Sequence, residues 1–325
     1  MDIPRREFIK TGLLAATGVA LSPSLIAQPH SPKVNGNCNF TISLFSKSIQ
    51  FLDYDRMADF IAELGFDGVD LTVRRDGHIN PEQVRSELPK VAKALEKVSK
   101  KITMITTGIV DADESAEAIL GTASCLGIKY YRTGYFNYDN KRDINLIIDE
   151  CKERMEKIEK LNRKYNIHGC YQNHSGPYRF VGGAIWDLQR IIKDLDPEFI
   201  GVQYDIMHAS VEGAYAWPYA LRLIAPWIKV LAIKDYLWSK DNTGKWRDQM
   251  VPMGEGMVDF DAYLKEVKTL SIPTNFSMHN MYDLGGAELG SLTPTMSKET
   301  IKQKIREDMN FMKILQQKYV KLTLK

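Results

Sequence analysis

The sequence carries almost no excess of charge of either sign. Lys and Arg total 43 and Asp and Glu total 41, so the formal net charge of the 325 residues is +2. A nucleic-acid-binding protein usually shows a strong basic excess, so this balance argues against a nuclease and against a nucleic-acid partner. Cysteine is also scarce. Cys38, Cys125, Cys151 and Cys170 form no CxxC pair and no zinc-ribbon spacing, and we expect them to be buried, unpaired thiols.

The apolar run near the start of the sequence is too short to span a bilayer as a mature helix. It follows Arg5-Arg6 and leads to Ala27. A basic segment, a short apolar segment and a small residue at a suitable cleavage point define an export signal, and the arginine pair resembles the twin-arginine type. We therefore expect a periplasmic protein that does not bind a membrane once the signal is removed. The expected segments are a twin-arginine-type signal peptide over residues 1–27, a flexible leader over 28–36 and a mature domain over 37–325.

The mature sequence alternates short β-rich stretches with amphipathic helical stretches. This alternation predicts βα units and a parallel sheet, and eight such strands predict an α/β fold in the form of a single-domain (β/α)8 TIM barrel. The expected strands are residues 40–45, 68–73, 102–107, 130–134, 169–173, 200–205, 230–234 and 275–280. The expected helices are residues 57–64, 84–98, 116–126, 144–161, 184–192, 219–223, 260–267 and 298–319. Long irregular stretches over 236–258 and 283–296 are typical of functional loops.

Polar residues stand at most of the expected strand ends, where a (β/α)8 barrel forms its active site. Asp205 and His208 leave the sixth strand, and either side chain can bind a metal or a substrate. Lys234 ends the seventh strand and can hold an oxyanion or act as a base, although a solvated ion pair at the rim is the alternative. Glu255, between two glycines, either reaches the site or caps its own loop.

Four of the six histidines gather at these strand ends, which favours metal binding or acid–base chemistry over a structural role. Aromatic rings also lie near the rim, and such rings can stack on the flat faces of sugars. The candidate catalytic residues are Lys234, His174, His208 and Glu255. The candidate substrate-binding residues are Arg74, His78, Arg132, Tyr171 and Trp238.

Five segments of the chain resemble the xylose isomerase-like barrel superfamily, which includes sugar phosphate isomerases and epimerases and shares its fold with apurinic endonucleases. They are residues 171–176, 201–209, 233–235, 254–259 and 277–279. The resemblance extends over residues 37–320 and implies a divalent metal, Mn, Co, Zn or Mg. In the family this metal is bound by a glutamate, an aspartate, a histidine and a glutamate on strands five to eight.

This sequence departs from that ligand pattern. Asp205 matches the aspartate, but Gln172 and Ala232 stand where the first glutamate and the histidine are expected. His279 lies at or beside the position of the second glutamate. The metal ligands that the resemblance implies are therefore Gln172, Asp205, His208 and His279. Because the paired carboxylates are missing, any proton transfer has to use His174, His208, His279, Lys234 or Glu255.

The sequence supports three functional hypotheses, all with a small carbohydrate or glycoside as ligand. The first is a sugar isomerase or epimerase that removes a proton next to a sugar carbonyl with the help of a metal. The second is a lyase or hydratase acting on an oxidised (3-keto) glycoside. The third is a sugar-binding barrel that has lost catalysis. Association into a homo-oligomer is left open.

Overall fold

The computed structural model describes residues 40–176 and 180–323. The expected signal peptide and leader, and Cys38, lie outside the described residues. Of the other cysteines, Cys151 and Cys170 are buried as expected, but Cys125 is exposed at the end of a helix. No helix in the described ranges is both long and apolar enough to cross a membrane.

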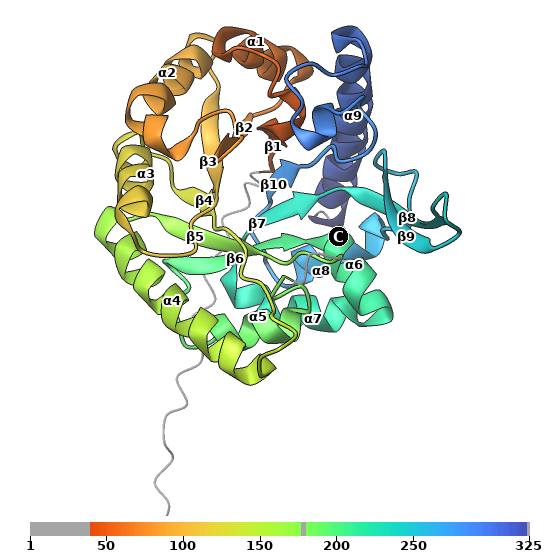
Figure 1. Ribbon diagram of the computed structural model, residues 1–325. Coiled ribbons are helices and arrows are strands. Elements are labelled where there is room, and N and C mark those ends of the chain that lie inside the picture. The colour runs from red at the N-terminus through yellow and green to blue at the C-terminus, as the bar shows by residue number, and fades with distance from the viewer. Residues whose placement is uncertain (1–39, 177–179, 324–325) are drawn as a thin grey trace, which may run out of the picture. The chain divides into compact units, whose positions relative to one another are not determined.

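Eight parallel strands close into a barrel, as the sequence predicts. The last strand, β10, pairs with both β1 and β7 and so closes the sheet (Figure 1). Full closure leaves no strand edge unpaired. The barrel strands are β1 (Thr41–Phe45), β2 (Gly68–Val73), β3 (Lys101–Thr107), β4 (Tyr130–Arg132), β5 (His168–Gln172), β6 (Ile200–Asp205), β7 (Ile228–Ile233) and β10 (Asn275–Met278).

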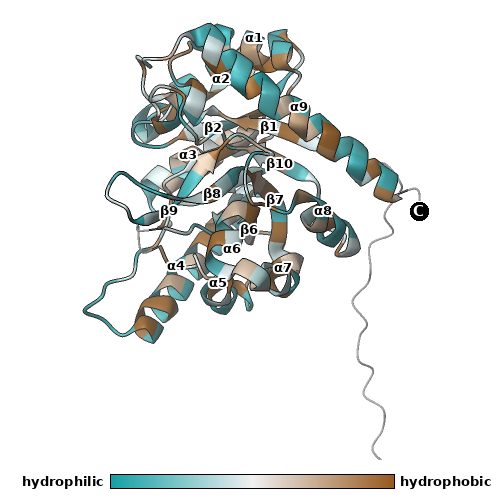
Figure 2. Cartoon of the chain, turned by 90° about the vertical axis from the view of Figure 1, so that its right-hand side faces the viewer, coloured by the Kyte–Doolittle hydropathy of each residue, from teal (hydrophilic) through white to brown (hydrophobic). Residues whose placement is uncertain are grey.

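Helices form a ring around the strands (Figure 1). Several of them begin at an aspartate whose carboxylate accepts a backbone N–H of the first turn, for example Asp53, Asp113 and Asp143. Helices such as α2 and α9 show separate hydrophilic and hydrophobic sides (Figure 2), because one side packs on the barrel. The helices are α1 (Tyr54–Leu64), α2 (Val84–Lys97), α3 (Glu114–Cys125), α4 (Ile144–Tyr165), α5 (Ile185–Ile192), α6 (Ile206–Gly213), α7 (Trp217–Ile224), α8 (Phe260–Thr269) and α9 (Lys298–Thr323).

The loop expected over residues 236–258 contains an antiparallel hairpin. Strands β8 (Asp235–Lys240) and β9 (Trp246–Val251) pair along their whole length and lie to the right of the barrel in Figure 1. Asp241 holds the turn by accepting the backbone N–H groups of Thr243 and Lys245. Both strands contain many polar residues, which hides the β pattern in the sequence, because both faces of this hairpin are largely exposed.

The barrel interior changes from apolar to polar along its axis. A small apolar cluster of Met104, Cys170 and Val230 fills one level of the interior. Two residues further along their strands, Thr106 and Gln172 are buried polar side chains. Since alternate residues of a strand point to the same face, these polar groups stand above the apolar layer and form the floor of the mouth.

Candidate functional site

Asp205 is the centre of the charged network in the barrel mouth. It is fully buried at the end of β6 and also caps α6, because its Oδ1 accepts the backbone N–H of His208 at 3.3 Å. Its Oδ2 accepts hydrogen bonds from Lys234 Nζ at 2.9 Å and from Gln172 Nε2 at 2.7 Å. Burial lowers the pKa of Lys234, and the Asp205 carboxylate opposes that shift. The carboxylate and the ammonium thus form a buried ion pair.

Gln172 links this ion pair to a buried arginine. Arg132, at the end of β4, donates from Nη1 to Gln172 Oε1 at 2.8 Å, and the hydroxyl of Tyr135 donates to the same oxygen. The Arg132 guanidinium also lies 5.1 Å from the centre of the Tyr135 ring. The amide of Gln172 is therefore held at both ends, by two donors at its oxygen and by one acceptor at its nitrogen.

Two histidine rings lie in contact beside Lys234. The ring centres of His174 and His208 lie 3.8 Å apart. Lys234 Nζ donates to His208 Nε2 at 2.7 Å, so the ring proton of His208 is on Nδ1, which faces Ser175 Oγ at 2.7 Å. His174 Nδ1 lies 2.7 Å from the carbonyl oxygen of Ser175. A carbonyl can only accept, so Nδ1 of His174 donates and Nε2 carries the lone pair.

Both imidazoles are neutral. Burial, followed by the nearby Lys234 ammonium, lowers the pKa of His174 to about 3 and that of His208 well below its ordinary value. A neutral imidazole can accept a proton. The mouth therefore combines a buried ammonium with two neutral imidazoles.

A second buried carboxylate, Asp70, lies in the middle of β2. Its oxygens accept hydrogen bonds from Thr106 and Ser277, each at 2.7 Å. His279 lies 3.9 Å from Asp70 through Nε2, and its ring stacks on Phe45 at 4.3 Å. Burial raises the pKa of Asp70. His279 is buried as well. Its pKa is lowered first by that burial and then by Lys234, Arg132 and His208, whereas Asp205 raises it, so His279 belongs to the same charged cluster.

Asp235 follows Lys234 directly but points elsewhere. Its two oxygens accept the backbone N–H groups of Tyr236, Gly254, Gly256 and Val258 at 2.8–3.1 Å. A Cβ on Gly256 would lie 2.2 Å from Asp235 Oδ1, so only glycine fits there, and Gly254 has a positive φ of 89°. The loop thus wraps around the Asp235 carboxylate. Glu255 is exposed at the tip of this loop.

We expect Asp235→Asn to destabilise the fold by about 3 kcal/mol, because an amide can accept at only one of its two ends and hydrogen bonds to charged groups are strong. Urea unfolding measures this loss. Asp261→Asn is the control, since it breaks only an exposed ion pair with Lys318 and should cost less than about 1 kcal/mol. Equal stability of the two variants would contradict the role assigned to Asp235.

The other predicted substrate-binding residues lie in different surroundings. His78 bonds to Ser46 and Thr72 through Nδ1, and burial lowers its pKa to about 4. Tyr171 is fully buried, and its hydroxyl accepts from the backbone of Phe136 and donates to that of Val181. Strand alternation turns Tyr171 to the opposite face of β5 from Gln172, so its side chain lies away from the mouth.

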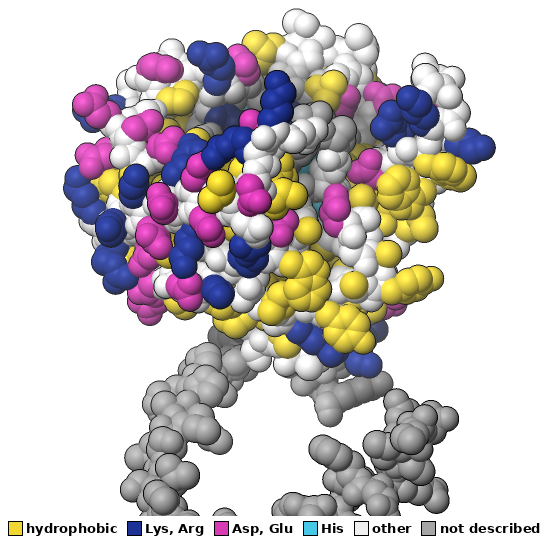
Figure 3. Space-filling view, turned by 60° about the horizontal axis from the view of Figure 1, so that its bottom comes forward, with side chains coloured by type: hydrophobic (Ala, Val, Ile, Leu, Met, Phe, Trp, Pro, Cys, Tyr) yellow, Lys and Arg dark blue, Asp and Glu magenta, His cyan; other side chains and the backbone are white. Residues whose placement is uncertain are grey.

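Trp238 lies on the hairpin and is 42% exposed. Its ring packs edge-on against Tyr236, next to the mouth residue Asp235. Hydrophobic side chains gather on the right-hand side of the molecule in Figure 3, whereas charged side chains of both signs cover the left. The large exposed hydrophobic residues of the hairpin and of the segments after β6 and β9 are Tyr215, Tyr219, Trp238, Trp246 and Met257.

Sequence reasoning missed several residues of the site. Asp70 is the only charged residue in its strand, and a carboxylate inside a buried apolar stretch was a usable signal. Tyr135 and Ser175 gave no such signal, because they lie in loops and their contacts form only across the barrel. Lys47, in the short helix η1 (Ser46–Ile49), was also missed.

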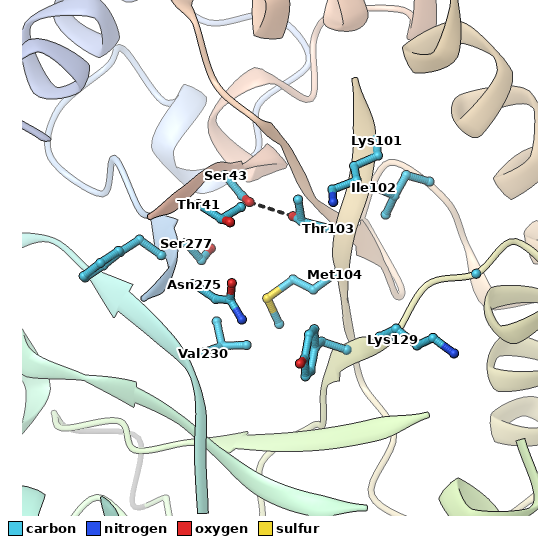
Figure 4. A pocket seen from close by; sticks show the side chains of 13 residues that line it. Thr41, Ser43, Lys101, Ile102, Thr103, Met104, Lys129, Val230, Asn275 and Ser277 are labelled. Atoms are coloured by element: carbon cyan, nitrogen blue, oxygen red, sulfur yellow. Dashed lines mark hydrogen bonds between the residues drawn. The ribbon is translucent and has the colours of Figure 1, made fainter. Parts of the chain in front are cut away.

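A cavity of about 160 Å³ lies at the opposite end of the barrel. It is lined by the first residues of several strands, and Thr103 donates a hydrogen bond to Ser43 across it (Figure 4). The only charged side chains at its edge are Lys101 and Lys129. The described residues that line it include no carboxylate and no imidazole, and in this fold that end of the barrel serves stability.

Residues 58–315 match the family model for xylose isomerase-like TIM barrels. The chain therefore belongs to the xylose isomerase-like TIM barrel family, which confirms the resemblance noted in its motifs. A search of curated proteins finds no match to this chain.

Solved structures with the same fold include two epimerases and one magnesium complex. An L-ribulose 3-epimerase has a TM-score of 0.64 at 14% identity, covering 87% of this chain and 97% of that chain. The 3-keto-D-glucoside 4-epimerase of E. coli has a TM-score of 0.61 at 14% identity, with 85% and 99% covered. A xylose isomerase-like protein from Mycobacterium smegmatis in complex with magnesium has a TM-score of 0.59 at 17% identity, with 83% and 98% covered. At these identities the likeness shows the fold alone.

The predicted metal ligands do not fit a divalent cation. Asp205 Oδ2 already binds the Lys234 ammonium, and the same ammonium faces His208 Nε2. Gln172 presents its amide nitrogen to Asp205, and a nitrogen that donates is no metal ligand. Across residues 40–176 and 180–323, no three His, Cys, Asp or Glu side chains are arranged to hold a metal. A positive charge, that of Lys234, already lies between the groups that would bind the metal.

We expect chelation with EDTA to leave the melting temperature of the wild-type protein unchanged. Lys234→Met should instead gain Mn²⁺ binding, because it frees Asp205 and His208 to act as ligands. Electron paramagnetic resonance of free Mn²⁺ measures this gain. Lys234→Met/Asp205→Asn is the control and should not bind. Stoichiometric metal in the purified wild-type protein, with a melting temperature that falls on chelation, would contradict this assignment.

Proposed function

We propose that the protein is a sugar-modifying enzyme that removes a proton from the carbon next to a sugar carbonyl. The observation that carries this proposal is the buried ammonium of Lys234 beside two neutral imidazoles. An ammonium has three donor hydrogens, and Asp205 and His208 account for two of them. The third can donate to a carbonyl oxygen of a bound sugar.

The proposed step begins when a base takes the proton from the carbon next to the carbonyl. The electron pair of that C–H bond forms a carbon–carbon double bond, and the carbonyl π electrons move onto the oxygen, giving an enolate. Lys234 stabilises the new negative charge, because it is held in a site from which water is largely excluded. If the base keeps this proton and a second group or a water molecule delivers another proton to the opposite face of the carbon, the product is an epimer. Loss of a substituent from the next carbon gives elimination instead.

His174 is the best-placed base. Its imidazole is neutral and partly exposed at the mouth, whereas the His208 ring is fully buried between Lys234 and Ser175. Glu255 is exposed at the tip of its loop, so it has no desolvated position from which to act. The structures with the same fold include epimerases, one of which acts on a 3-keto-glucoside, and this supports the choice of substrate class.

Hydrogen exchange tests the proposal whichever product the enzyme forms. Keto-sugars and 3-keto-glycosides are incubated with the enzyme in D₂O, and NMR follows deuterium entering the carbon next to the carbonyl. Epimerisation, isomerisation and elimination all pass through the same enolate, so each gives exchange. Release of the aglycone indicates a lyase, whereas exchange without release indicates an isomerase or epimerase. Tight binding of a keto-sugar with no exchange would favour a sugar-binding barrel instead.

The His174→Gln variant should lose exchange by about a hundredfold or more, the usual contribution of a general base. His168→Gln is a matched control, because His168 starts the same strand at the other end of the barrel and bonds to the Glu198 carbonyl. Exchange per folded molecule should be unchanged in that variant. Undiminished exchange in His174→Gln would show that another residue acts as the base.

We also propose that the chain is exported to the periplasm by the twin-arginine route. The proposal is supported by Arg5-Arg6 and the short apolar run that follows. Replacing both arginines by lysine should leave the precursor in the cytoplasm, as shown by cell fractionation. Lys10→Arg is the control and should be exported normally. Periplasmic protein that keeps Met1 in its mass spectrum would contradict the proposal.

A further inference from the structure

Three more cationic side chains surround the mouth, in addition to Lys234. The guanidinium carbons of Arg74 and Arg132 lie 6.0 and 5.9 Å from the centre of the same Phe45 ring. Lys47 follows two residues after Phe45, in η1. The ring of Phe45 also stacks on His279, so these cations lie at the wall of the site described above.

These three cations have no matching carboxylate. Across the described parts of the chain, none of Lys47, Arg74 and Arg132 has a carboxylate oxygen within 4.0 Å. Of the buried carboxylates nearest these cations, Asp205 pairs with Lys234, and Asp70 accepts hydroxyl hydrogens from its neighbours and acts on Arg74 and Arg132 only from beyond ion-pair distance. Arg132 is almost fully buried, and its Nε has no hydrogen-bond partner. A buried donor without a partner is costly, so it points to a missing acceptor.

The cations also act on one another. The pKa of Arg74 is lowered to about 10, first by burial and then by Arg132. The pKa of Lys47 is lowered to about 8, first by burial and then by Arg74, Arg132 and Lys234, and Glu288 opposes this shift. Glu288 itself accepts the backbone N–H groups of its own loop. Like charges held this close repel, and an anion between them removes the repulsion.

We propose that Arg74, Arg132 and Lys47 bind an oxyanion carried by the substrate, either a carboxylate or a phosphate. Guanidinium groups bind both anions through paired hydrogen bonds. The inference rests on the proposed function, and it narrows the substrate to a sugar acid or a sugar phosphate. The fixed oxyanion would orient the sugar so that its carbonyl meets Lys234.

Calorimetry on the mature protein tests the site with D-glucuronate, D-glucose 6-phosphate and D-glucose as probes. At least one anionic probe should bind about tenfold or more tightly than glucose, and added salt should weaken it. Comparing the affinities of D-glucuronate and D-glucose 6-phosphate shows whether the site prefers a carboxylate or a phosphate. Arg74→Gln should reduce that affinity by about tenfold. Arg75→Gln, which changes the exposed neighbouring residue, is the matched control and should not.

Equal binding of all three probes, no saturable binding of either anion, or unchanged affinity in Arg74→Gln would each overturn the proposal. Binding and turnover are measured separately, so the two proposals can fail independently. If the anions bind but no keto-sugar exchanges its proton, the result supports the oxyanion site and contradicts the proposed function. If neutral keto-sugars exchange their proton as readily as acidic ones, the result supports the proposed function and contradicts the oxyanion site.

Discussion

Replacing Lys234 with methionine is expected to reduce turnover of a keto-sugar by two orders of magnitude or more. The side chain keeps its length but loses the charge that stabilises the enolate oxygen, and a single preorganised donor of this kind is worth about 10²–10³ in rate. Substrate binding should change far less, because the lost interaction strengthens only as negative charge develops. Steady-state kinetics measures this as a fall in kcat with a small change in KM.

The fold should survive this change. Asp205 still accepts hydrogen bonds from Gln172 and from the backbone N–H of His208, so its carboxylate remains solvated by the protein. Circular dichroism checks that the variant is folded before its kinetics is compared. Near-normal turnover in the folded variant would reduce Lys234 to a structural residue.

Asp205→Asn is expected to cost about 3–5 kcal/mol of stability at neutral pH, because it leaves the Lys234 ammonium buried without its counter-charge. The double variant Asp205→Asn/Lys234→Met removes both charges and should recover most of this loss. Urea unfolding of the wild type, both single variants and the double variant gives the coupling energy directly. Additive losses in the double variant would show that the two groups do not interact.

The pH dependence of Asp205→Asn follows from the same pair. Burial already lowers the pKa of Lys234, and the variant removes Asp205, the strongest of the groups that oppose this shift. Once the pH exceeds the folded pKa of Lys234, the folded state loses the proton that the unfolded state still binds, so stability rises with pH. The difference in unfolding free energy between Asp205→Asn and the wild type should therefore be largest at neutral pH and become smaller towards alkaline pH. A difference in stability that grows with pH would contradict the interpretation that Lys234 is buried as an ammonium without its counter-charge.

The wild-type site could be drawn only partly from the sequence. The strand ends and their polar residues were predicted, because a buried parallel strand leaves an apolar run that stops at the polar rim. Lys234 and Asp205 were correctly placed at neighbouring strand ends. Their direct contact was not predicted, and the family resemblance implied instead a metal bound by Asp205 together with Gln172, His208 and His279. The hairpin β8–β9 was missed because its polar strands bury little surface.

The sequence by itself determined the barrel and many, though not all, of the ionisable groups at its mouth. Alternating strand and helix periods fix the order of the βα units. In these units the apolar face of each helix packs against the parallel sheet through a right-handed crossover. Only the tertiary structure decided how the charges are matched. Lys234 turns to Asp205, while Asp235 turns to the loop of Gly254 and Gly256. Pairing of this kind depends on which atoms meet when distant strands close into a barrel, and no local pattern in the chain records those distances.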